Sequence, residues 1–146
     1  MTGSDGRLTV ALSRVVAGIF EDFGTSAGKV AGWIEKVRTS TLPDQLCAIC
    51  EVRKGPFESH HVAGRNNSDL CVTVCIRCHS RLSERQNHWD PRWTAVSKPE
   101  ALRWTFLLFG LGDLCQERAR HGNNAYHLTA KRLWAIYAEW ARETNS

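Results

Sequence analysis

The chain has 146 residues, of which 42% are hydrophobic, and its formal net charge is +4. This apolar content can build a compact core, so the composition excludes an intrinsically disordered tail. The small positive charge permits binding to nucleic acid without requiring it. The longest apolar run, Trp104 to Leu111, is shorter than the roughly 20 residues that a membrane-spanning helix needs, and the first residues lack a secretory signal pattern. We therefore expect a soluble, cytoplasmic protein without a membrane partner.

Two helices are predicted in residues 1–46. The first extends from Leu8 to Phe23 and stops at Gly24, and the second starts at Thr25 or Ser26. The stretch from Thr39 to Asp44 contains a proline and is typical of a linker. The positions expected to face the core are Leu8, Leu12, Val15, Val16, Ile19, Phe20 and Phe23 in the first helix, and Val30, Trp33, Ile34 and Val37 in the second.

Four of the six cysteines form two CxxC pairs, Cys47 with Cys50 and Cys75 with Cys78. Such pairs offer four thiolates to one tetrahedral zinc ion, whose preferred ligands are soft sulfurs. The alternative is buried or redox-active cysteines, but a thioredoxin-like motif needs a single pair in a βαβ setting that this sequence does not show. Because protein would fill all four positions, the predicted zinc is structural. The remaining cysteines, 71 and 115, are predicted to be packing residues.

Two further helices are predicted after residue 93. Ser97 as N-cap, Pro99 at the first position and Glu100 in a capping box favour a helix that ends near Arg120. The last helix carries one apolar stripe of Leu133, Ile136, Tyr137 and Trp140. Tryptophans in these helices are expected in the core, whereas Trp89 and Trp93 are expected to pin the central segment to the flanking helices.

The segment between the cysteine pairs contains His60-His61-Val62, and His79 directly follows the second pair. Together with the cysteines, this order resembles the signatures of the HNH (ββα-metal) nuclease family in its zinc-containing form. The resemblance covers residues 47–82, about a quarter of the chain. It implies a β-hairpin followed by a helix, with strands at 57–62 and 70–74 and a helix from residue 78 towards 86. The strand-prone valines and the loop-prone run from Asn66 to Asp69 agree with that order.

The resemblance also implies a role for each histidine. His60 and His79 match ligands of a catalytic divalent ion, Mg²⁺ or Mn²⁺, and His61 matches the general base. A neutral imidazole can deprotonate the attacking water, and the ion compensates charge at the phosphate. Since consecutive residues on a strand point to opposite faces, we expect a bulge or a strand end at the histidine pair.

Substrate contacts are predicted for Arg81, Arg65 and Asn67. Arg81 recurs at four-residue spacing with two other arginines, so it shares a face of the predicted helix with them. Such a guanidinium could clamp the scissile phosphate, although a basic helical face is more often only solvated.

Two positions depart from the family pattern. Leu70 stands where the signature asparagine is expected, so Asn66, Asn67 or Asp69 would have to brace the loop. Ser83 stands where some members have a third histidine. Two protein ligands completed by water suit Mg²⁺ or Mn²⁺ better than a second zinc.

We therefore predict an α-rich α+β fold. An N-terminal helical segment, 1–46, and a C-terminal helical segment, 94–146, would pack on a central ββα-metal module, 47–93. The predicted function is endonucleolytic cleavage or nicking of DNA, and the resemblance implies a phage or mobile-element origin. The alternatives are a non-catalytic zinc module that binds nucleic acid or protein, and a helical adaptor whose interface is the stretch from Trp104 to Leu114.

Overall fold

Five helices accompany one antiparallel hairpin in the computed structural model, which describes residues 3–24 and 26–144. The elements in chain order are α1 (Gly3–Phe23), α2 (Ser26–Arg38), β1 (Phe57–His61), β2 (Cys71–Cys75), α3 (Ile76–Gln86), a short 3-10 helix η1 (Pro91–Thr94), α4 (Glu100–Ala119) and α5 (Asn124–Thr144). The predicted α-rich α+β class is confirmed. None of the described helices is long and apolar enough to cross a membrane. The division of the chain at residues 46 and 93 stays a prediction.

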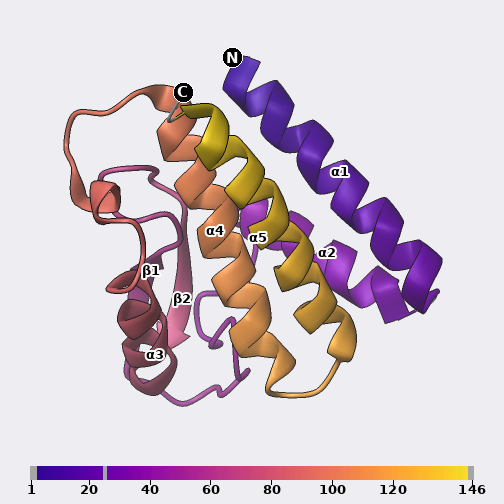
Figure 1. Ribbon diagram of the computed structural model, residues 1–146. Helices are drawn as coiled ribbons and strands as arrows, with labels where there is room; N and C mark the ends of the chain where they lie inside the picture. The colour runs from indigo at the N-terminus through magenta and orange to yellow at the C-terminus, as the bar shows by residue number, and fades with distance from the viewer. Residues whose placement is uncertain (1–2, 25, 145–146) are drawn as a thin grey trace.

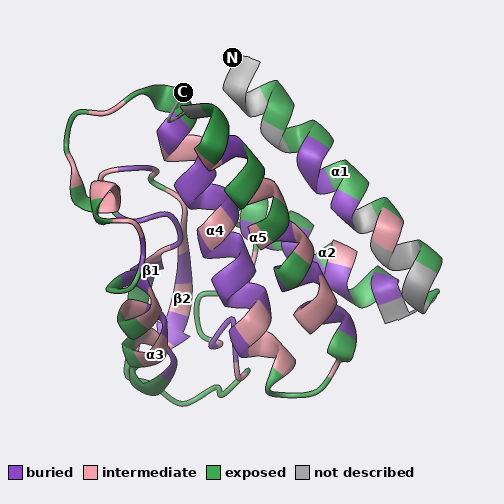
Figure 2. Ribbon diagram, viewed as in Figure 1, coloured by how far each residue is buried: buried purple, intermediate pink, exposed green. Residues whose placement is uncertain are grey.

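Helix α4 is the central element of the fold. It packs along α5, and Figure 1 shows the hairpin and α3 on one side of this pair and α1 on the other. Figure 2 shows α4 buried over most of its length, whereas α1 and α5 have exposed outer faces. Phe106, Leu108, Leu111 and Leu114 are at most 1% exposed. The apolar stretch from Trp104 to Leu114 therefore builds the core, and the adaptor hypothesis loses the interface on which it depended.

The N-terminal helices follow the predicted pattern where their side chains are described. Helix α1 begins five residues before the predicted start, and its Leu12 and Val15 are buried. The other predicted core side chains of α1 (Leu8, Val16, Ile19, Phe20 and Phe23) lie outside the described part, as does Thr25. All four residues predicted to be buried in α2 are buried. The amphipathic spacing was sufficient to identify both helices.

The hairpin and α3 occupy nearly the predicted ranges. Strand β1 ends one residue earlier than predicted, and β2 is shifted by one residue towards the C-terminus. Their antiparallel register pairs Phe57 with Cys75 and His61 with Cys71. Helix α3 begins two residues early because the Cys75 Sγ accepts a hydrogen bond from the Cys78 N–H and so acts as the N-cap. The second CxxC pair is therefore part of the helix start.

The start of α4 differs from the prediction. The helix begins at Glu100 with Pro99 at the N-cap and no side-chain capping bond, so the assignment of Ser97 as N-cap was wrong. The carbonyl of Pro99 accepts the first helical hydrogen bonds, from the N–H groups of Leu102 and Arg103 at 3.1 and 3.3 Å, so the helix starts after the proline. On α5, Leu133 and Trp140 are buried while Ile136 and Tyr137 are half-buried, which confirms the predicted stripe.

A buried acidic pair on α4 holds α3 in place. Arg81 and Arg85 donate through their Nε atoms to the two carboxylate oxygens of Glu117, at 2.7 and 2.6 Å. Trp89 Nε1, just after α3, donates to Asp113 Oδ2 at 2.9 Å, which confirms the predicted pinning role of this tryptophan. Burial raises the pKa of Glu117, but the two guanidinium groups outweigh it and hold the pKa below its ordinary value. Breaking the ion pairs of Glu117 would leave an uncompensated buried charge, so these ion pairs fix α3 on the core.

One glycine permits the closest approach between the core and the hairpin. A Cβ at Gly110 on α4 would lie 1.8 Å from the carbonyl oxygen of Val62, directly after β1. Val62 is fully buried, so neither backbone can move aside without disturbing the core. Gly110 therefore sets the distance between α4 and the end of β1.

We predict opposite effects for two glycine substitutions. Gly110→Ala should destabilise the protein by roughly 1–3 kcal/mol or more, because it overpacks this contact. Gly32→Ala, in α2 with open space around its Cβ, should stabilise it by about 0.5–1 kcal/mol through helix propensity. Chemical denaturation of both variants measures this, and equal effects would contradict the close approach.

A second prediction concerns the pH dependence of stability. Burial raises the pKa of Asp113 from 3.8 to about 6, although Trp89 and Arg85 partly oppose the shift. The folded protein therefore keeps a proton that the unfolded chain has lost, so this contribution to stability falls as pH rises from about 4 to about 6. Asp113→Asn still accepts the tryptophan N–H but cannot ionise. Relative to wild type, the variant should gain about 1 kcal/mol between pH 5 and 7.5 in urea unfolding.

Candidate metal centre and histidine cluster

The four cysteines of the CxxC pairs lie together at one end of the hairpin. Among the described residues, their Sγ atoms form a group in which all lie within 4.8 Å of one another. The Sγ atoms of Cys50 and Cys75 are 3.8 Å apart, and a tetrahedron with zinc–sulfur bonds of about 2.3 Å has edges of about 3.8 Å. The cysteines are free thiols and form no disulfide. Their donor chemistry and spacing fit one structural zinc ion.

Local backbone bonds shape the first cysteine pair and join it to the sheet. The Glu51 N–H donates to the Cys47 carbonyl at 3.0 Å, and the Ala48 N–H donates to the Thr73 carbonyl of β2 at 2.8 Å. Burial raises the pKa of Cys47, but backbone N–H groups directed at its sulfur outweigh this and bring the pKa to about 7. These backbone groups favour the thiolate of Cys47, whereas burial raises the pKa of Cys50 and of Cys78.

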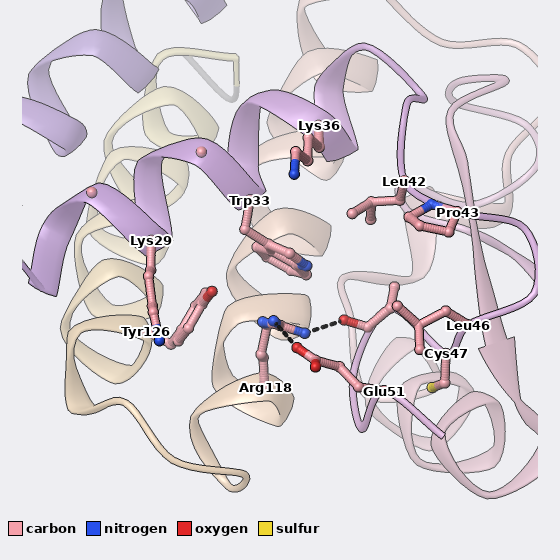
Figure 3. A pocket seen from close by; sticks show the side chains of 13 residues that line it. Lys29, Trp33, Lys36, Leu42, Pro43, Leu46, Cys47, Glu51, Arg118 and Tyr126 are labelled. Atoms are coloured by element: carbon pink, nitrogen blue, oxygen red, sulfur yellow. Dashed lines mark hydrogen bonds and ion pairs between the residues drawn. The ribbon is translucent and has the colours of Figure 1, made fainter. Parts of the chain in front are cut away.

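Arg118 of α4 clamps the first cysteine pair onto the helical core. Its Nη1 donates to the Ala48 carbonyl at 2.6 Å, and its Nη2 donates to the Glu51 carboxylate. Its guanidinium lies 5.0 Å from the ring centroid of Trp33 and 5.2 Å from that of Tyr126. Figure 3 shows these groups beside an open cavity of about 500 Å³ between α2, the linker and the cysteine turn. Sequence reasoning missed Arg118, because nothing in the sequence links residue 118 to residue 48.

His60 and His79 meet between β1 and α3. Their ring centroids are 5.4 Å apart with an interplanar angle of 72°. His60 is 2% exposed, and burial lowers its pKa to about 3, with further lowering by the nearby His79 and His61. A neutral imidazole retains the lone pair that a cation needs. The structure thus brings the two predicted metal ligands together, while their binding of an ion stays a prediction.

Glu58 adds a carboxylate to this pair. It lies two residues before His60 and therefore on the same face of β1. Its Oε1 is 2.9 Å from Nδ1 of His79. Sequence reasoning did not select Glu58, although strand alternation could have indicated it.

His61 is the last residue of β1, so the expected strand end is present at the histidine pair. Its carbonyl accepts a hydrogen bond from Gln86 Nε2 of α3 at 3.0 Å, which ties the strand end to the helix. Its side chain is half-buried. The hydrogen bond to Gln86 thus fixes the backbone of His61, and the role of its side chain as general base stays a prediction.

The predicted substrate-binding residues lie in different surroundings. Arg81 is two residues from His79, hence about 200° around the helix, and faces Glu117 instead of the histidines. Arg65 is exposed in the loop between the strands. Asn67 is buried, and its Nδ2 donates to the carbonyls of Ala63 and Trp93 at 2.6 and 3.0 Å. Asn67 therefore makes loop-bracing bonds, and Asn66 adds one from its Nδ2 to the Thr94 carbonyl at 2.9 Å. Substrate contact by Arg81, Arg65 and Asn67 stays a prediction.

The cysteine cluster yields a direct prediction. Purified protein should contain one zinc ion per chain, and Cys47→Ser or Cys78→Ser should remove it and unfold the hairpin and α3, because these elements bury little apolar surface without the metal. Cys71→Ser, a half-buried cysteine outside the cluster, should retain both zinc and fold. Elemental analysis and circular dichroism measure the two properties. Folded wild-type protein without zinc would contradict the assignment.

Comparisons with family models, with curated proteins and with solved structures find no significant match. Membership of the HNH family, which residues 47–82 resemble in sequence, therefore stays a prediction. Function has to be inferred from the arrangement of the cysteines and histidines themselves.

Proposed function

We propose that this protein is a metal-dependent endonuclease of the HNH (ββα-metal) type that hydrolyses or nicks DNA. The observation that carries the proposal is the meeting of His60 and His79 between a β-hairpin and the helix that follows it. A structural metal held by the cysteines does not require a second, separate group of histidines. The pattern of ligand types also separates the two sites, since sulfur suits zinc and imidazole with water suits harder or borderline cations.

The proposed chemistry assigns one task to each histidine. His60 and His79 would hold a divalent cation, Mg²⁺ or Mn²⁺, which supplies positive charge for the scissile phosphate and the leaving 3′ oxygen. His61 would accept the proton of the attacking water through its imidazole. Its backbone bond to Gln86 would keep the strand end at a fixed distance from α3. The products would carry 5′-phosphate and 3′-hydroxyl ends.

A second candidate is a zinc module that binds nucleic acid or a protein without cleaving it. One observation favours it. Arg81 and Arg85 are ion-paired with Glu117, so no phosphate clamp from this part of α3 lies beside the histidines. Cleavage of supercoiled plasmid by zinc-loaded protein, with and without added Mg²⁺ or Mn²⁺, separates the two candidates.

Two histidine variants test the assigned tasks. His61→Ala should lower the cleavage rate by a factor on the order of 10² to 10⁴ at every metal concentration, because added metal ion cannot take over the proton acceptance of the missing imidazole. His79→Ala should lose activity through weaker ion binding, and added Mn²⁺ should restore part of it by mass action. His121→Ala, an exposed histidine in the α4–α5 turn, is the control and should cleave normally. Equal recovery of the first two variants, or wild-type cleavage by His61→Ala, would show that the base is misassigned.

A further inference from the structure

Glu58 and His79 form a contact between the strand and the helix that flank the proposed ion site. The Glu58 side chain is 48% exposed and that of His79 is 27% exposed, and their Oε1 and Nδ1 atoms are 2.9 Å apart. His60, two residues from Glu58, lies against the same imidazole. The His79 ring thus contacts both a carboxylate and a second imidazole from β1.

This contact constrains the proton on His79. An ionised carboxylate only accepts hydrogen bonds, so the proton shared with Glu58 belongs to the imidazole Nδ1. In a neutral ring with the proton on Nδ1, Nε2 keeps its lone pair. A carboxylate on one nitrogen of a metal-binding histidine fixes both the tautomer and the ring orientation, and it raises the basicity of the other nitrogen.

We propose that Glu58 is a positioning residue for the ion site: it fixes His79 in the Nδ1–H tautomer and leaves Nε2 available to the divalent cation. The inference rests on the proposed function. Glu58 acts through His79 and is not itself a ligand. Its Oε1 is occupied by His79, and within the described residues only the cysteine cluster gathers three or more ligand atoms within 4.8 Å.

The competing interpretation is an ordinary surface ion pair. Half-exposed pairs contribute little to stability, so both interpretations predict a folded Glu58 variant. They differ in the proton position on His79 and in the affinity for the cation. The chain also offers an internal control, since His88 Nε2 and Glu84 Oε1 form an exposed contact of 3.2 Å on and just after α3.

The first measurement uses zinc-loaded, full-length protein without any added divalent cation. Long-range ¹H–¹⁵N spectra at pH 8, where an unperturbed imidazole is neutral, report which nitrogen of His79 carries the proton. Wild type and Glu58→Gln, whose amide oxygen still accepts, should show the Nδ1–H form. Glu58→Ala should shift His79 towards the Nε2–H form that imidazole prefers in water, and Glu84→Ala should leave His79 unchanged.

The second measurement is Mn²⁺ binding by calorimetry or electron paramagnetic resonance. Glu58→Ala should weaken Mn²⁺ binding about 10- to 100-fold, the usual effect of removing a carboxylate behind a histidine ligand. Glu58→Gln should keep most of the affinity, and Glu84→Ala should keep all of it. Equal losses in the Gln and Ala variants would overturn the inference, because Glu58 would then act by its charge or as a ligand.

The two proposals fail in different ways. In the first case, wild-type protein cleaves plasmid, but Glu58→Ala changes neither the His79 tautomer nor the Mn²⁺ affinity. This result would overturn the positioning role and leave the nuclease proposal intact. A wild-type protein that binds no Mn²⁺ and cleaves no DNA would overturn the nuclease proposal and, with it, the purpose of the contact. The spectra without added cation would still show whether Glu58 sets the proton on His79.

Discussion

The convergence of four cysteine sulfurs at one end of the hairpin is the constraint on which the rest of the site depends. Two strands of five residues and a helix of eleven residues bury too little apolar surface to be stable alone. A tetrahedral metal would join the turn before β1 to the start of α3 and so close the unit from both sides. Cys75 has two roles in this arrangement, as a member of the cluster and as the sulfur that caps α3.

Helix α4 gives this small unit a fixed position. Arg118 holds the first cysteine turn through backbone carbonyls, Glu117 holds α3 through two arginines, and Gly110 lets α4 approach the end of β1. Adjacent residues 117 and 118 thus reach opposite parts of the same unit. Charged groups are suited to this task because their hydrogen bonds are directional, whereas apolar packing alone tolerates sliding.

This bracing directs two basic side chains of α3 towards α4. Arg81 was predicted to contact the phosphate, but the buried carboxylate of Glu117 takes the Nε donors of Arg81 and Arg85. The histidine cluster is instead bordered by Glu58, a residue of opposite charge. An acidic neighbour favours a cation at this site and disfavours direct approach of phosphate without one.

The helices, the approximate strands and the four members of the cysteine cluster could be predicted from the sequence alone. These features are local or repeat in the sequence. Hydrophobic spacing identifies amphipathic helices, and the two CxxC pairs identify four candidate ligands of one chemical type. The partners of Arg81, Arg118 and Glu58 and the buried position of Asn67 could not be predicted, because they depend on how the elements pack. These contacts join residues 21 to 70 positions apart, or depend on which face of an element a side chain occupies. Charged side chains have no preferred partner in a sequence, because the choice is made by whichever opposite charge the packing of the helices brings within hydrogen-bond distance.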